Sequence, residues 1–300
     1  SDIEQRAADI IAKFAPGVHI TKSSDVGGVG LVDRENATIV NACLVPFAQQ
    51  VVQSLKAAFA SVGVHVKPLF SQNDGTLISD EMVRTFPIFT CSAGPTNSIR
   101  GAGFLTRLQD AIVVDIGGTT TDIGFLKNGF PRETSTANFI GGVRTNFRMP
   151  DVLSIALGGG TMITPAESGL KIGPESVGYQ LKSKGLIFGG DTLTATDIAV
   201  AAGNINLGDP SRVAGLDKAM ATAASHQMHT MIEEAIDQMR SSAKPVDVIL
   251  VGGGNILVNR NIEGAARVLR PEHAGVANAV GAAIAQVGGR IDSLYDYADG

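Results

Sequence analysis

Residues 113–124 read VVDIGGTTTDIG and decide the fold of this 300-residue chain. The β-branched run predicts a buried strand that delivers Asp115 to a tight turn at Gly117 and Gly118. A return strand then carries Asp122. The Asn-Gly pair at 128–129 is a strong signal for a second two-residue hairpin directly afterwards. We therefore expect an antiparallel portion of sheet here.

The same turn has the chemistry of a phosphate and magnesium site. Its glycines leave backbone amides unshielded, and the threonines add hydroxyl donors. Two carboxylates beside such a turn suit a hydrated Mg²⁺ and a polyphosphate, because carboxylates hold the ion's waters while amides take phosphate oxygens. We predict Asp115 and Asp122 as catalytic residues and metal ligands, although a hairpin with two ordinary turn aspartates is the alternative. The cofactor-binding residues of this turn are expected to be Gly117, Gly118, Thr119 and Thr120.

A second glycine turn follows the apolar strand predicted over 246–251. Three glycines after a buried strand let a flat ligand such as adenosine lie on the backbone. The run is neither a Walker A loop nor the dinucleotide fingerprint, because the required Gly-Lys-Ser/Thr and G-x-G-x-x-G spacings are absent. A turn that packs against a helix explains it equally well. The expected nucleoside-binding residues are Gly252, Gly253, Gly254 and Asn255.

Hydrophobic periodicity predicts alternating helices and strands, which is an α/β pattern. Residues 37–44 are compatible with a strand or a helix start, and 23–28 with a loop. Helices are expected over 3–14, 47–61, 79–86, about 97–106, 194–202, 211–241 and 276–287, and strands over 64–70, 111–115, 119–126, 132–140, 153–157 and 246–251.

Composition excludes several classes of protein. The net charge is -5 with no basic block, so nucleic acid is not an expected partner. Two cysteines, Cys43 and Cys91, cannot build a disulfide framework. No apolar run is long enough to span a bilayer and no secretory signal opens the chain, so we expect no membrane partner and a cytoplasmic location.

Several polar residues have both a functional and a structural interpretation. Asp197 follows Thr194 at a predicted helix start, where it either ligates the metal or is an ordinary N-terminal acid. Arg144 and Arg148 follow a glycine pair and bind a phosphate or a substrate carbonyl, unless they form surface salt bridges. Asn73 and Asp74 either contact a substrate or form a turn. His226 and His229 either bind a metal as a pair or lie on a solvated helix face.

These stretches resemble the second phosphate motif and the adenosine motif of the superfamily that contains actin, sugar kinases and the heat-shock chaperone ATPases. Within it the chain closely resembles the hydantoinase/oxoprolinase family, meaning the A-type subunit of N-methylhydantoinase and 5-oxoprolinase. It is also similar to subunits of acetone and acetophenone carboxylases. The matching stretches are FAPG (14–17), ENAT (35–38), QNDGTL (72–77), SAGPTNS (92–98), DIGGTTTD (115–122), GGVR (141–144), IGP (172–174), FGGD (188–191), ATD (195–197) and ANAVGAA (277–283).

The resemblance implies an α/β, actin-like ATPase (ribonuclease H-like) fold with mixed sheets, present in part. It implies an N-terminal α/β segment over 1–109 and an ATPase domain over 110–300. Family members carry another D-x-G-G-T-F-T-D motif in a preceding domain, whereas residues 25–30 (DVGGVG) lack the threonines and the closing acid. We therefore expect this chain to be a fragment.

The implied activity is ATP-dependent hydrolysis of a cyclic amide or imide, such as a hydantoin or 5-oxoproline, through phosphorylation of its carbonyl. ATP and Mg²⁺ are the implied cofactors, and a B-type hydantoinase subunit is the implied partner, with a homo-oligomer as a further expectation. Three alternatives remain open: a small-molecule kinase, the ATP-using subunit of a ketone carboxylase, and a non-catalytic nucleotide-binding module.

Overall fold

The structure is a computed structural model that describes residues 2–28, 30–134, 138–166 and 169–288. It contains two compact units, each assembled from separate stretches of the chain. Unit 1 comprises Ser1–Ala93, Glu133–Pro150 and Ala285–Gly300, and unit 2 comprises Gly94–Arg132 and Asp151–Ile284. The domain boundary expected after residue 109 stays a prediction, because compactness does not test which parts of the chain fold independently.

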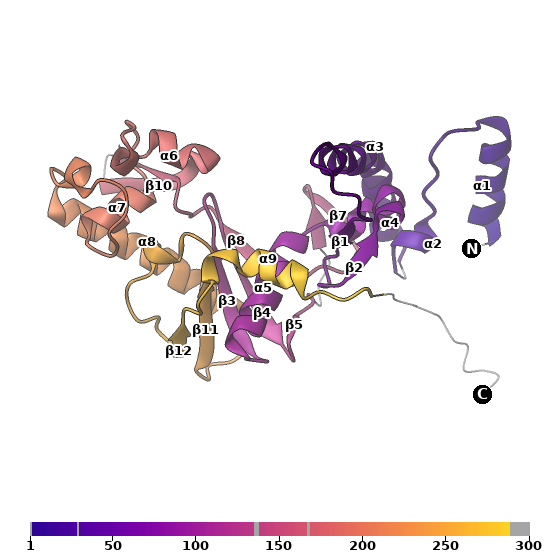
Figure 1. Cartoon of the computed structure of the whole chain (residues 1–300). Coiled ribbons are helices and arrows are strands. Elements are labelled where there is room, and N and C mark those ends of the chain that lie inside the picture. The colour runs from indigo at the N-terminus through magenta and orange to yellow at the C-terminus, as the bar shows by residue number, and fades with distance from the viewer. Residues whose placement is uncertain (1, 29, 135–137, 167–168, 289–300) are drawn as a thin grey trace. The chain divides into compact units, whose positions relative to one another are not determined.

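Unit 2 is built on a mixed sheet in the order β12-β11-β3-β4-β5, with β8 also paired to β4 (Figure 1). The β11 strand is parallel to both β3 and β12, whereas β4 is antiparallel to β3, β5 and β8. The predicted mixed α/β sheet is therefore confirmed. The strands are β3 (Ala111–Ile116), β4 (Thr121–Lys127), β5 (Phe130–Pro131), β8 (Val152–Ile155), β11 (Val246–Val251) and β12 (Ala265–Leu269).

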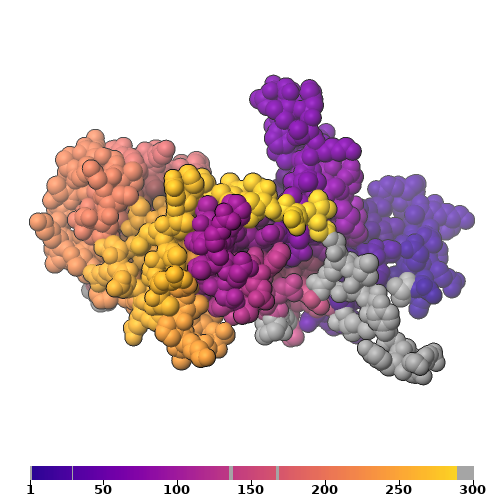
Figure 2. Space-filling view, turned by 60° about the horizontal axis from the view of Figure 1, so that its bottom comes forward, coloured from indigo at the N-terminus to yellow at the C-terminus, as the bar shows by residue number. Residues whose placement is uncertain are grey.

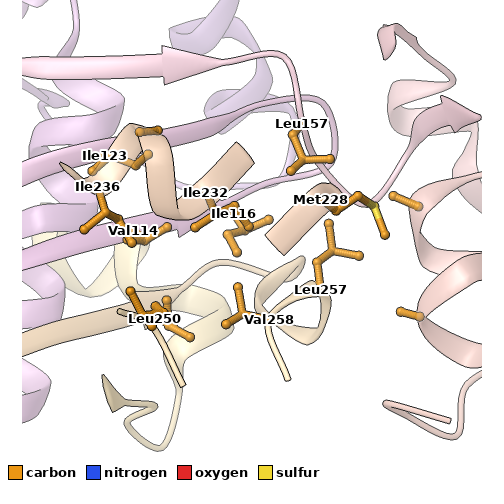
Figure 3. Packing of buried hydrophobic residues seen from close by; sticks show 14 of the residues in the cluster. Val114, Ile116, Ile123, Leu157, Met228, Ile232, Ile236, Leu250, Leu257 and Val258 are labelled. Carbon is orange, nitrogen blue, oxygen red and sulfur yellow. The ribbon is translucent and has the colours of Figure 1, made fainter. Parts of the chain in front are cut away.

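Both faces of this sheet are buried, which explains why β3 is apolar at nearly every position. Ile112, Val114 and Ile116 pack on one face with α7 (Ala195–Ala201) and α8 (Lys218–Met239), as Figure 3 shows for part of the cluster. The alternate residues Ala111 and Val113 belong to a second cluster with α5 (Ala93–Thr106). Since side chains alternate along a strand, a two-faced core requires a continuous apolar run.

The second face is closed by two helices whose backbones touch. A Cβ atom built at Gly101 of α5 would lie 1.9 Å from the carbonyl oxygen of Ala277, and one at Gly281 of α9 (Ala277–Ala283) would lie 1.8 Å from that of Asn97. In the space-filling view the yellow α9 segment lies against the purple α5 segment (Figure 2). Only glycine permits this approach, because any side chain at either position would collide with the backbone of the other helix.

The rest of unit 2 is a hairpin and short helical turns. The β9 (Thr161–Ala166) and β10 (Gly169–Ser176) hairpin was not expected from the sequence. The long helix expected over 211–241 begins only at Lys218, because an Asp209-capped 3₁₀ turn occupies the preceding segment. The short helices are α6 (Leu181–Lys184) and 3₁₀ turns at Gly178–Gln180, Leu186–Phe188, Pro210–Val213, Asn255–Leu257 and Ala274–Val276.

Unit 1 is mostly helical, with two small antiparallel pairs, β1–β2 and β6–β7. Helix α4 begins after its expected cap, Ser79, whose hydroxyl accepts the Met82 N–H. The elements of unit 1 are α1 (Asp2–Phe14), α2 (Ser23–Val26), α3 (Val32–Ser61), β1 (Leu69–Ser71), β2 (Leu77–Ser79), α4 (Asp80–Thr85), a 3₁₀ turn at Pro87–Thr90, β6 (Asn138–Ile140) and β7 (Val143–Thr145).

Several expectations for unit 1 differ from the structure. Of the two alternatives for 37–44, the structure has the helix: the segment belongs to α3, which begins at Val32 and not at the predicted start at Phe47. Phe47 is 66% exposed, because the buried face of α3 runs instead through residues such as Val45 and Val52. Residues 23–26 form a helical turn, and the strand expected over 64–70 is confined to 69–71. The strand expected over 132–140 includes positions 135–137, which lie outside the described residues.

Candidate functional site

Asp115 and Asp122 occupy directly opposite positions on β3 and β4. They lie on the sheet face that carries Ala111 and Val113, so they point toward α5. The Ser98 hydroxyl on α5 donates to Asp115 Oδ2 at 2.5 Å, and the Ser154 hydroxyl donates to Asp122. The strand register thus brings together the two carboxylates that the sequence singled out.

The environment of Asp115 disfavours its ionised form. Burial raises the pKa of this carboxyl above its ordinary value; the hydrogen bond from Ser98 lowers it, and the neighbouring charge of Asp122 raises it again. The ionised form of Asp115 is therefore less favourable here than that of an aspartate in water. A cation held by both carboxylates would relieve the repulsion between them, because it favours the charged form of each.

The turn between β3 and β4 is closed by its first glycine. The Gly117 N–H donates to the Thr120 carbonyl at 2.9 Å, so this amide already has a partner within the turn. Gly118, Thr119 and Thr120 are exposed and remain candidates. The exposed part of the turn is therefore one residue shorter than the sequence suggested.

The second glycine turn lies beside the first because β11 is the parallel neighbour of β3, with Val251 in register with Asp115. Gly252 has φ +81°, and a Cβ atom there would lie 2.3 Å from Asp115 Oδ1. The Gly254 N–H donates to the Ile116 carbonyl at 2.7 Å. Gly253 is exposed, and a Cβ atom there would meet nothing within 4 Å. The two motifs, far apart in sequence, therefore share one edge of the sheet.

A third glycine turn, at 158–160, completes this edge. The Gly159 and Gly160 amides donate to the carbonyls of Gly117 at 2.9 Å and Gly118 at 2.7 Å. A Cβ atom at Gly158 would lie 2.6 Å from the Thr119 nitrogen. Sequence analysis did not assign this turn to the site, although a strand that ends in three glycines was a visible signal.

The carboxylate of Asp197 stabilises the start of a helix and does not face an open site. Its fully buried carboxylate accepts the Thr194 N–H at 2.8 Å, the Thr194 hydroxyl at 2.7 Å and the Ile187 N–H at 2.9 Å. Thr194 in turn caps α7, so the two residues form a capping box. We therefore remove Asp197 from the predicted metal ligands. Within the described ranges, no group of three or more His, Cys, Asp or Glu side chains is placed to hold a metal.

The other candidates lie outside this edge. Arg144 pairs with Asp33 at 3.3 Å and Arg148 with Glu133 at 3.5 Å, both in unit 1. The buried His229 Nε2 lies 3.2 Å from both the Asn261 carbonyl and Glu233, which does not support the metal-pair interpretation. His226 contacts Thr230, Asn73 donates to the Arg148 carbonyl, and Asp74 accepts the N–H and hydroxyl of Thr76.

The sequence pattern of the hydantoinase/oxoprolinase family matches residues 34–211, which is more than half of the chain. The chain belongs to this family. Its curated relatives include the caprolactamase α subunit of Pseudomonas jessenii, 25% identical over 78% of this chain and 34% of that protein. The acetophenone carboxylase γ subunit of Aromatoleum aromaticum is 25% identical over 68% of this chain and 29% of that protein. The acetone carboxylase β subunit of Xanthobacter autotrophicus is 26% identical, with the same coverage.

Two solved structures share the fold. The ATP-dependent caprolactamase from Pseudomonas jessenii has a TM-score of 0.73 at 21% identity, over 95% of this chain and 46% of that chain. Nucleotide-free acetone carboxylase has a TM-score of 0.70 at 22% identity, over 95% of this chain and 45% of that chain. The α/β actin-like ATPase fold is thereby established. The chain spans about a third of the length of the curated relatives it matches.

Among the residues that the structure describes, none of the helices combines the length and the apolar character needed to cross a bilayer.

Proposed function

We propose that this chain binds ATP with Mg²⁺ at the edge formed by the three glycine turns, as the nucleotide-binding part of an enzyme that opens a cyclic amide or imide. The observation that carries the proposal is the position of Asp115 and Asp122. Their carboxylates lie directly opposite each other on β3 and β4, at the end of the sheet where the glycine turns leave the backbone uncovered by side chains. Membership of the hydantoinase/oxoprolinase family supports the reaction class.

The residues at this edge suit a magnesium nucleotide. Mg²⁺ is usually held by one or two carboxylates, substrate phosphates and retained waters, so a pair of acids without a third protein ligand fits it. When bound, the ion would neutralise charge on the phosphates. Asp115 and Asp122 would hold its waters, the amides of the exposed residues Gly118 and Thr119 would take phosphate oxygens, and Gly253 would let adenosine lie on the backbone. Asn255, whose side chain donates to the Gly252 carbonyl, would keep that turn in shape.

ATP is needed because an unstrained amide is stabilised by resonance and its nitrogen is a poor leaving group. Attack of the amide oxygen on the terminal phosphorus forms an O–P bond, breaks the bond to ADP and activates the ring carbon. Water then adds to that carbon and the C–N bond breaks, which leaves an acyl phosphate on the opened chain. A second water hydrolyses this acyl phosphate and releases phosphate. The balance is lactam, ATP and two waters in, and ring-opened amino acid, ADP and phosphate out.

A ketone carboxylase subunit is the second candidate, supported by the acetone and acetophenone carboxylase relatives. An ATP-dependent carboxylation would also require bound nucleotide, so the same edge would serve either reaction. Product analysis separates them. A ring-opened acid supports the hydrolase, a bicarbonate-dependent keto acid supports the carboxylase, and a stable phosphorylated product supports a kinase.

A partner subunit is part of the proposal, because the curated relatives are named as subunits. We propose that a B-type subunit completes hydrolysis after the carbonyl has been phosphorylated. Turnover is therefore best measured with that subunit present, whereas nucleotide binding is measured on this chain.

Asp115→Asn tests the site. Calorimetry with ATP and Mg²⁺ is expected to give a Kd about tenfold or more above the unsubstituted chain, the value of one charge-assisted interaction, and turnover in the complete enzyme is expected to be lost. The fold should persist, because the substitution removes a charge that burial disfavours. Asp110→Asn, which removes an exposed acid paired with Lys127, is the matched control. Equal affinity and turnover in the two variants would refute the assigned role of Asp115.

A further inference from the structure

The two acids of the candidate site each accept a hydrogen bond from a serine, but the two serines differ in burial. Ser98 on α5, which donates to Asp115 Oδ2 at 2.5 Å, is only 1% exposed. Ser154, which donates to Asp122, is exposed. Water competes for the hydrogen bond of an exposed hydroxyl, whereas a buried hydrogen bond is protected from this competition and is electrostatically stronger. The firmer of the two contacts is therefore the one between Ser98 and Asp115.

The hydroxyl proton of Ser98 has a fixed direction. Asn278 Nδ2, on α9, donates to the Gly94 carbonyl at 2.8 Å and lies 3.3 Å from Ser98 Oγ. Because its other contact is a carbonyl oxygen, this atom of Asn278 is the donating nitrogen, so Ser98 Oγ accepts from it. A hydroxyl has a single proton, and that of Ser98 is left for Asp115. Asn278 therefore orients the donor that Asp115 accepts.

The helices that carry Ser98 and Asn278 have little freedom to shift. Gly101 and Gly281, where the backbones of α5 and α9 touch, each lie three residues beyond one of these two polar residues. Residues three apart on a helix lie on the same face, so the polar contact is one turn away from the backbone contact. The separation of Ser98 and Asn278 is thus set by backbone that is already in contact.

The other oxygen of Asp115 is confined as well. A Cβ atom at Gly252 would lie 2.3 Å from Asp115 Oδ1, which means that the backbone of the second glycine turn lies directly against this oxygen. A rotation of the carboxylate would break the bond from Ser98 or press an oxygen into that backbone. The orientation of this carboxylate is therefore held from two sides.

We propose that Ser98 is a positioning residue, whose hydroxyl, oriented by Asn278, holds the Asp115 carboxylate in the orientation that binds the waters of a nucleotide-bound Mg²⁺. This inference rests on the proposed function, because it gives Ser98 a task at the ATP site. The hydrogen bond also favours the ionised carboxylate and so opposes burial, which raises the pKa of Asp115. Residues that orient the ligands of a metal in this way usually contribute tenfold or more to its affinity.

Calorimetry with ATP and Mg²⁺ on Ser98→Ala and Ser98→Cys tests the proposal. Each variant should bind about tenfold more weakly than the parent, because alanine has no donor and a thiol of similar size is only a weak one. Asn278→Ala should lose less, since Asn278 is exposed and water can take its place. Ser225→Ala is the matched control: it removes a serine that is 4% exposed, from the helix α8 on the opposite face of the sheet, and its Kd should stay within about twofold of the parent.

A double-mutant cycle with Asp115→Asn separates positioning from a general effect on the fold. If Ser98 acts through the charge of Asp115, Ser98→Ala should change the Kd by less than about twofold once Asp115→Asn is present. A serine that only supports α5 would weaken binding by the same factor in both backgrounds. Thermal melting of every variant without nucleotide shows that each is folded, and Ser98→Cys, which keeps the volume, carries the comparison if Ser98→Ala does not fold.

Two results would overturn the proposal: affinity in the Ser98 variants equal to that of the parent, or equal losses with and without the Asp115→Asn substitution. Either result, together with weakened binding by Asp115→Asn alone, removes the role of Ser98 and leaves the proposed ATP site in place. If Asp115→Asn itself binds ATP and Mg²⁺ as tightly as the parent, the proposed site fails, and the positioning role fails with it.

Discussion

Replacing Gly252 with alanine should damage the candidate site and the stability of unit 2 together. The Cβ atom that this change adds would lie 2.3 Å from Asp115 Oδ1 and 2.3 Å from the Ile116 carbonyl oxygen. Real Cβ atoms do not approach backbone oxygen so closely, so β3 and β11 must separate or the turn must change. The position also has φ +81°, which alanine adopts only with strain.

The expected cost follows from these two effects. Left-handed backbone costs a non-glycine residue about 1–2 kcal/mol, and one extra carbon in a packed site costs about 1–3 kcal/mol. The free energy of unfolding should therefore fall by roughly 2–5 kcal/mol. For a unit of about 150–250 residues, this corresponds to a Tm lower by at least about 4 °C.

Thermal and urea denaturation, followed by circular dichroism, measure the change in the free energy of unfolding. Calorimetry with ATP and Mg²⁺ measures nucleotide binding at the site. The adjacent Gly253→Ala is the control, because its Cβ atom would meet nothing within 4 Å. We expect this control to shift stability by less than about 0.5 kcal/mol. If the two variants unfold at the same temperature, Gly252 does not pack against the Asp115 carboxylate as the structure shows.

Two further predictions concern buried acids. Asp197→Ala should destabilise the protein by about 2–4 kcal/mol, because it removes the acid of the α7 capping box and leaves the Ile187 N–H unsatisfied, whereas removing the exposed Asp191 should have little effect in the same melting experiment. The pKa of Asp80 is lowered mainly by its hydrogen bond from Lys56, so this acid stabilises the fold above its unfolded pKa of about 3.9 and loses that contribution as the pH falls below it. Lys56→Met should therefore be less stable than the parent at pH 7, and the difference should shrink in acid; a difference that is constant with pH would contradict the pairing.

Local sequence signals predicted the elements that surround the site. The capping pattern at Thr194 and Asp197 and the buried strands at 111–116 and 246–251 follow from rules that act over a few residues. Such rules did not distinguish the two uses of Asp197. A capping acid and a metal ligand have the same local pattern, and only burial decided between them.

Helix faces were less predictable. On α3 the apolar residues extend around much of the circumference, so periodicity alone does not select the buried side; the fold buries the side with Val45 and Val52 and leaves Phe47 exposed. Which side is buried depends on the segments that pack against the helix, and those come from elsewhere in the chain.

The sequence by itself determined that a glycine turn between two acids follows a buried strand, because β-branched residues, glycines and an Asn-Gly pair act locally. Only the tertiary structure decided that Gly252 and Gly158 lie against that turn, and that Asp197 does not take part. Strand order and register are set by burial of side chains on both faces of the sheet, which is a property of the whole unit and not of any single stretch.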